Sequence, residues 1–270
     1  MSHPDHHTTE TGPEPGETPV VAGTDVERGD TELGNTVAAL TADDLEPAGR
    51  RELLGRLVGD IRRRGLGKLF RPKAALRWMA DVVADVAPHV PIRDRATLRQ
   101  HFPGLDDDDL AKRLIRNAMR STAGVGAVGG GVAAVEWVAT PTLLSAPVLL
   151  AAETVSVVAI EIKLVGELHE VYGRPITDGP GRTVALLQAW SQQRGVNLVP
   201  GVGLATVLGT AARKELQSSL LRRFGRSLTT MGPLLTGAAV AGFLNGRATH
   251  SLGGNVQKDL KRGHRRIIEG

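Results

Sequence analysis

The sequence predicts an all-α protein: a multi-helix bundle built on a Gly/Ala-rich apolar helical hairpin, with a disordered N-terminal tail. Residues 121–173 hold two long apolar segments that meet at Thr140-Pro141-Thr142. Both are too long for strands, and the second carries charges at helical spacing, so they predict two antiparallel helices. A similar Gly-punctuated apolar segment returns at residues 231–245. The absence of Cys from the 270 residues excludes thiolate catalysis, Cys-based zinc sites and disulfides.

Charge divides the chain unevenly, although its overall value is only +4. Residues 1–40 contain eight acids and one Arg, a net charge of −7, which leaves +11 for residues 41–270. Residues 1–41 are polar and show no apolar periodicity, so we expect a disordered acidic tail. This tail lacks the features of a secretory signal, which favours a cytoplasmic location. The basic body meets an anionic surface, or the tail covers its basic face, or both are simply solvated.

Residues 42–104 predict basic amphipathic helices. The first begins at Thr41-Ala-Asp-Asp, places Leu45, Leu54, Leu57 and Ile61 at helical spacing, and breaks at Gly65-Leu-Gly67. Its opposite face carries arginines, namely Arg50, Arg51, Arg56, Arg62, Arg63 and Arg64. A second helix is expected over residues 72–87 and a short one over residues 92–102. This segment either packs on the rest of the chain or stands apart.

Residues 105–270 predict the main bundle. Four acids, Asp106–Asp109, open its first helix, because acids at a helix N-terminus favour the dipole whereas calcium loops place their ligands at alternate positions. The glycines between residues 124 and 131 lie late in a helix or just after it and follow no strand, so they indicate close helix packing and not a nucleotide-binding loop. Another helix is expected over residues 183–193.

The helix over residues 145–172 is expected to become amphipathic towards its end, where Glu161, Lys163, Glu167 and Glu170 appear. Glu153 is unusual because it lies in an apolar stretch, and a buried carboxylate must be paired or protonated. Glu136 occupies a similar place in the first arm, so the two acids could act as a general acid and base. No nucleophile or metal-ligand set accompanies them, and we assign no catalytic, cofactor-binding or metal-binding residue.

Residues 227–246 have the length of a membrane-spanning helix between Arg226 and Arg247, but Pro233 and several Gly and Thr residues interrupt them. We rank a buried helix of a soluble bundle first, a peripheral protein on anionic lipid second, and a spanning helix third. The predicted basic surface consists of eight residues: Arg62, Arg63, Arg64, Arg222, Arg223, Lys261, Arg262 and Arg265.

Three segments resemble the EcsC family, helical proteins named for a gene beside a bacterial ABC transporter. They are Gly124–Ala134 with the helix end Glu167-Leu-His-Glu-Val-Tyr172-Gly173, the stretch from Arg174 to Leu187, and the Pro/Gly-Ala/Asn/Thr pattern from Pro233 to Thr249. The resemblance covers roughly residues 110–262. It implies a helical bundle in a membrane-linked context and supplies no mechanism.

A polar cluster is also expected inside the bundle. Asn245 and Thr249 are four residues apart and share one helical face, from which they can hydrogen-bond to Glu153 or Tyr172. We predict that this cluster holds the bundle together.

These observations favour a non-enzymatic, membrane-associated or accessory protein whose basic face contacts an anionic membrane surface from the cytoplasm. The alternative is a soluble interaction module that binds an acidic protein partner, and the third hypothesis is an enzyme using a buried Glu pair. No nucleic acid is expected, because the basic residues are not interleaved with aromatic ones and no binding motif is present.

Overall fold

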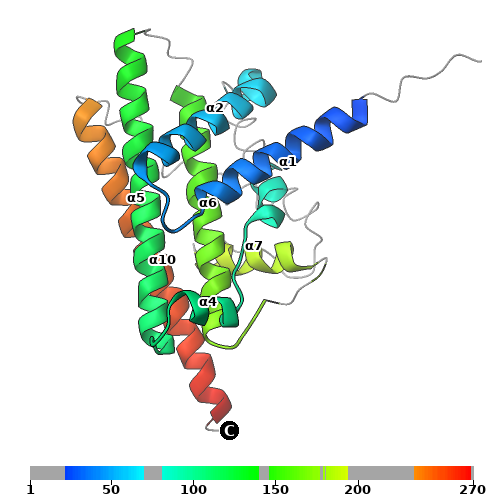
Figure 1. Ribbon diagram of the computed structural model, residues 1–270, viewed down its shortest axis with the longest axis vertical. Coiled ribbons are helices and arrows are strands. Elements are labelled where there is room, and N and C mark those ends of the chain that lie inside the picture. The colour runs from blue at the N-terminus through cyan, green and yellow to red at the C-terminus, as the bar shows by residue number, and fades with distance from the viewer. Residues whose placement is uncertain are drawn as a thin grey trace, which may run out of the picture.

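The computed structural model describes residues 22–69, 81–139, 146–176, 179, 181–193 and 234–268, and within them it forms helices and no strand. The predicted all-α fold class is therefore confirmed. The long helices α5 (Asp107–Ala139), α6 (Ala146–Val171) and α10 (Leu234–Ile268) run along the molecule, and α1 (Ala22–Leu40) and α2 (Pro47–Leu69) cross its upper part (Figure 1). In chain order the elements are α1 (Ala22–Leu40), α2 (Pro47–Leu69), a helical turn at 81–86 that leads into η1 (Ala87–His89), α4 (Arg95–His101), α5 (Asp107–Ala139), α6 (Ala146–Val171), α7 (Arg182–Gln193) and α10 (Leu234–Ile268).

The helical hairpin is formed by α5 and α6, which pack against each other. Asp106 caps α5, because its Oδ1 accepts the backbone N–H of Asp109 at 2.7 Å. The α6 helix ends at Val171, and the turn after it contains Gly173, whose φ of +64° suits a residue without a Cβ. The backbone N–H groups of Gly173 and Arg174 close this end on the carbonyls of Glu170 and His169. The predicted turn at residues 140–142 lies outside the described residues.

The centre of the core is α6, which contacts α1, α2, α4, α5, α7 and α10. Every side chain from Val148 to Leu168 is buried except Leu150 and Glu153. A helix that is buried on all sides needs apolar residues around its whole circumference, and the Val, Ile and Leu residues of α6 provide them. The prediction that its second half is amphipathic is wrong, since Glu161, Lys163 and Glu167 are buried with the rest.

Small residues bring α10 against α5. A Cβ added to Gly242 would lie 2.8 Å from the backbone oxygen of Ala123, and one added to Gly126 would lie 2.9 Å from the backbone of α10 at Ala241. Neither position can accept a side chain unless the helices separate. This geometry confirms that the glycines of this region serve close helix packing. They lie within α5, which continues past them to Ala139.

Part of the predicted disordered tail is helical. Instead of remaining disordered as far as Thr41, residues 22–40 form α1, and Leu33, Val37 and Leu40 are at most 1% exposed. These three residues recur at i, i+4 and i+7, which is one face of a helix. The sequence did not predict this helix, because the segment around these three residues is polar and acidic. Residues 1–21, including His3, His6 and His7, lie outside the described residues.

Two predictions about the following helix also need correction. Helix α2 begins at Pro47, where proline suits the first helical position, and it continues through Gly65 and Gly67 to Leu69. Arg50, expected on its exposed face, is 5% exposed. This helix packs on the rest of the chain and does not stand apart from it. It contacts α5 and α6, and Leu54, Leu57 and Ile61 are fully buried.

Of the predicted spanning segment, residues 234–246 form the start of α10, and residues 227–233 lie outside the described part of the chain. No helix in the described ranges is both long enough and apolar enough to cross a membrane.

Candidate functional site

The predicted polar contact between α10 and α6 is present. The Nδ2 group of Asn245 donates a hydrogen bond to Oε1 of Glu153 at 2.7 Å, and Asn245 is 5% exposed. Gly129 on α5 leaves space for this carboxylate, because a Cβ there would lie 3.2 Å from Oε2 of Glu153. The Glu136 side chain lies outside the described part, so the hypothesis of a catalytic Glu pair gains no support.

Thr249 has a different partner from either of those predicted. Its Oγ1 donates to Oε1 of Glu161 at 2.8 Å, and Nε1 of Trp190 donates to Oε2 of the same carboxylate at 3.0 Å. Glu161 is 1% exposed, so these donors offset part of the cost of burying it. The interaction connects α6 to α7 and α10. The sequence signal was available, since Glu161 stands within a run of Val and Ile.

Tyr172 belongs to a second polar group and does not join Asn245 or Thr249. Its hydroxyl donates to Oδ1 of Asp108 at 2.9 Å and accepts from Nε2 of Gln257 at 2.9 Å. Lys261 also pairs with Asp108, at 2.6 Å, and this hydrogen bond is the main reason that the pKa of Asp108 is lowered. Burial, aided by Asp108, raises the pKa of Tyr172. The group connects the start of α5, the end of α6 and the last third of α10.

A buried cluster of four charges was not foreseen. Arg93 binds Glu167 through two hydrogen bonds, of 2.7 and 2.9 Å, and binds Asp43 at 2.7 Å. Lys163 donates to the backbone oxygen of Thr41 at 2.8 Å and lies 3.3 Å from Asp43. Two cations and two carboxylates make the cluster neutral.

Burial is the largest influence on both of these carboxyl groups. It raises the pKa of Glu167, whereas at the more exposed Asp43 the charges of Lys163 and Arg93 overcome it and the pKa is lowered. The cluster connects α6 to the loop before α2, which contains Asp43, and to the loop after η1, which contains Arg93. Each cation of the cluster pairs with both carboxylates, which indicates a structural role.

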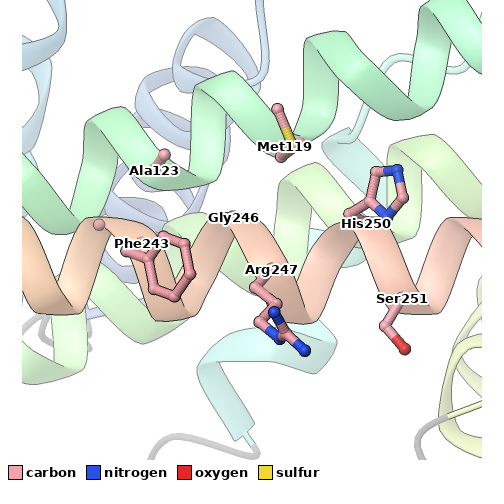
Figure 2. Close-up of a pocket in the computed structure, with 8 residues that line it drawn as sticks. Met119, Ala123, Phe243, Gly246, Arg247, His250 and Ser251 are labelled. Carbon is pink, nitrogen blue, oxygen red and sulfur yellow. The ribbon is translucent and has the colours of Figure 1, made fainter.

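An open groove of about 690 Å³ lies between α5 and α10. Met119 and Ala123 line it from α5, and the residues that line it from α10 are Gly242, Phe243, Gly246, Arg247, His250 and Ser251 (Figure 2). The groove follows from the small-residue contact, because Ala123, Gly242 and Gly246 provide little side-chain volume to fill the space beside it. This volume is within the range of small-molecule binding sites, roughly 300–1,000 Å³.

The solvent face of α10 beside this groove combines apolar and cationic side chains. Phe243 is 64% exposed and Leu244 is 55% exposed, and they are the large apolar residues that the described part of the chain leaves open to solvent. Arg247 lies one turn further along, exposed and without a carboxylate partner among the described residues. Helical spacing places Arg116 and Arg120 on the solvent side of Met119 and Ala123, and both are exposed. We call this surface the α5–α10 face: Phe243, Leu244, Arg247, Arg116 and Arg120.

The predicted basic surface is only partly recovered, and it is not a single patch. Arg62 and Arg63 are exposed on α2, but Arg63 pairs with Asp60. Lys261 is occupied by Asp108, and the exposed Arg262 lies 3.8 Å from Asp259. Figure 1 places α2 and the C-terminal end of α10 at opposite ends of the molecule. The side chains of Arg64 and Arg265, and the whole of Arg222 and Arg223, lie outside the described part.

The sequence reasoning missed the α5–α10 face. The signal was present, because a helix that buries Asn245 and Thr249 must turn Phe243, Leu244 and Arg247 outward.

The described residues do not assemble a recognisable reaction centre. No group of three or more potential metal ligands occurs among them. His250 and Ser251 both line the groove, but the His250 ring rises towards α5 while Ser251 points away (Figure 2). This geometry does not make a Ser–His pair for nucleophilic catalysis. What the groove and its surroundings offer is an apolar surface bordered by cations.

Comparison with known proteins adds no relative: no family model matches the chain, and no curated protein or solved structure is significantly similar to it.

Proposed function

We propose that this protein is a non-enzymatic, peripheral membrane protein that binds anionic lipid at the cytoplasmic surface through its α5–α10 face. The observation that carries the proposal is the exposure of Phe243 and Leu244, 64% and 55%, one helical turn before Arg247, which has no carboxylate partner among the described residues. Large apolar side chains that remain in water beside unpaired cations are typical of a surface that inserts between lipid headgroups.

The charge of α10 supports the same function. Residues 234–268 contain six Lys and Arg residues and one Asp, a net charge of +5. Each cation close to an anionic leaflet contributes about 1 kcal/mol of binding free energy. Partial burial of Phe243 and Leu244 in the interface adds the hydrophobic contribution that separates lipid binding from simple electrostatic attraction.

Membership of the EcsC family is a further part of this proposal, and it rests on the sequence resemblance over residues 110–262. What the resemblance adds is the membrane-linked context, which agrees with a lipid-binding surface but does not define it.

Flotation of the purified full-length protein with phosphatidylglycerol vesicles tests the proposal. Wild-type protein should float, should float less as salt rises, and should not float with phosphatidylcholine vesicles. Arg247→Glu reverses one interfacial charge, a change of about 2 kcal/mol, so binding should weaken roughly 30-fold. Arg62→Glu is the matched control, because it makes the same charge change on α2 away from this face, and it should bind like wild type.

The double substitution Phe243→Ser, Leu244→Ser distinguishes lipid from an acidic protein partner. It should abolish the flotation that persists at high salt while leaving the fold intact, because both side chains are exposed. Failure of the wild-type protein to float under any condition would contradict the proposal and favour the soluble module that binds an acidic partner. Equal loss of binding in Arg62→Glu and Arg247→Glu would show that the α5–α10 face is not the contact.

A further inference from the structure

The groove between α5 and α10 opens beside the α5–α10 face, and its lining residues divide into two parts. Met119, Ala123 and Phe243 form an apolar part, while Arg247 and His250 lie along its α10 border. We propose that this groove binds one acyl chain of an anionic lipid, whose headgroup pairs with Arg247. The proposal rests on the function proposed above and identifies a lipid site within the same surface.

The groove is hollow for a reason that involves both helices. Gly242 and Gly246 allow α10 to approach α5 so closely that an added Cβ would meet the backbone oxygens of Ala123 and Met119, at 2.8 and 3.2 Å. Because the residues at the contact have no side chains, the groove beside it stays unfilled. The contact fixes the two helices relative to each other, so the groove is preformed and binding requires no rearrangement of the backbone.

The chemistry of the lining favours a hydrocarbon chain over a polypeptide. A bound peptide would need partners for its backbone N–H and C=O groups, and those left unpaired would be costly. The side chains of the apolar part, Met119, Ala123 and Phe243, cannot supply them. An acyl chain makes no such demand, and apolar contact alone stabilises it.

The charges around the groove select an anionic headgroup. Arg247 is exposed and has no carboxylate partner among the described residues, and in Figure 2 its guanidinium extends from α10 away from α5, at the edge of the groove. Arg116 and Arg120 are exposed cations on α5. None of the described residues that line the groove is Asp or Glu. A phosphate at Arg247 would therefore meet the attraction of this guanidinium and no carboxylate from that lining.

Titration of the full-length protein with monomeric lysophosphatidylglycerol, below its critical micelle concentration, tests the proposal. Binding should be saturable at one lipid per chain. Lysophosphatidylcholine, which has the same kind of chain and no net charge, should bind at least tenfold more weakly, and inorganic phosphate should show no saturable binding. These comparisons separate the contribution of the chain from that of the phosphate.

Two tryptophan substitutions on α10 locate the site. His250 lines the groove and its ring points towards α5, so His250→Trp should fill the groove and weaken lysophosphatidylglycerol binding at least tenfold. Asn255 is exposed further along α10 and does not line the groove, so Asn255→Trp should change binding less than twofold. Both variants should keep the wild-type circular dichroism spectrum, since both positions are exposed.

Vesicle flotation separates this inference from the function on which it rests. His250→Trp should still float with phosphatidylglycerol vesicles, because it retains Phe243, Leu244 and Arg247. If wild-type protein floats but does not bind the monomeric lipid, or if the two tryptophan variants bind it equally, the groove site is wrong and surface binding stands. Binding of polyglutamate that His250→Trp abolishes, without any lipid binding, would make the occupant an acidic protein and would also overturn the inference.

Discussion

Substitution of Gly242 by Ala tests the close contact between α5 and α10, on which both the bundle and the groove depend. At an unconstrained helix interior, Gly→Ala stabilises by roughly 0.5–1 kcal/mol because alanine has the better helix propensity. At Gly242 the new Cβ would lie 2.8 Å from the backbone oxygen of Ala123, which cannot move without displacing α5. Overpacking of this kind costs about 1–3 kcal/mol, so the net effect should be destabilisation by about 1–2 kcal/mol.

Gly254 provides the control on the same helix, because a Cβ there would meet no atom within 4 Å. Gly254→Ala should stabilise by about 0.5–1 kcal/mol, opposite in sign to Gly242→Ala. Urea unfolding followed by circular dichroism at 222 nm measures both changes, provided that the m-value stays constant. If Gly242→Ala stabilises the protein as much as Gly254→Ala does, the helices are not in contact at this position and the packing argument fails.

Three other substitutions test the polar interactions of the core. Asn245→Leu should lower the free energy of unfolding by about 1–3 kcal/mol, because it removes the 2.7 Å hydrogen bond to a carboxylate; an unchanged melting temperature would show that the polar cluster does not hold the bundle together. Arg93→Met should cost about 3–5 kcal/mol in urea unfolding, because the buried Glu167 carboxylate loses both hydrogen bonds that it accepts from Arg93. Arg99→Met, which removes an exposed ion pair, should cost under about 1 kcal/mol, and equal losses would contradict the burial argument. Burial lowers the pKa of His169 below its ordinary 6.5, so the unfolded chain takes up a proton before the folded one as the pH falls. The free energy of unfolding should therefore decline on acidification below about pH 6.5. His169→Gln should lose that component of the pH dependence.

Local patterns in the sequence predicted the hairpin and its ends well. The acids at Asp106–Asp109 and the glycine after Tyr172 are terminal signals, and their hydrogen bonds are made within a few residues of each signal. The contact of Asn245 with Glu153 was also within reach, since one polar residue on an apolar face needs a polar partner opposite it. These features depend on short sequence distances or on a single periodicity.

Interactions set by tertiary packing could not be predicted in the same way. Arg93 and Asp43 look like ordinary loop residues, and only the folded chain shows that they meet Glu167 in the core. Helix α1 was not predicted, because its stability comes from the packing of three buried leucine and valine residues and not from a helix-forming composition. The outward orientation of exposed residues such as Phe243 could be predicted from helical spacing. The groove beside them could not, because it is formed by two helices more than a hundred residues apart in the sequence.

The depth of Leu244 in a bilayer tests the lipid-binding account most directly. Because the chain contains no Cys, Leu244→Cys and Arg62→Cys can each carry a single nitroxide label without further changes. On phosphatidylglycerol vesicles, electron paramagnetic resonance should show the label at position 244 gaining collisions with oxygen and losing them with a water-soluble nickel complex. The label at position 62 should remain in water. Vesicle-bound protein whose label at position 244 stays as water-accessible as the label at position 62 would contradict the account.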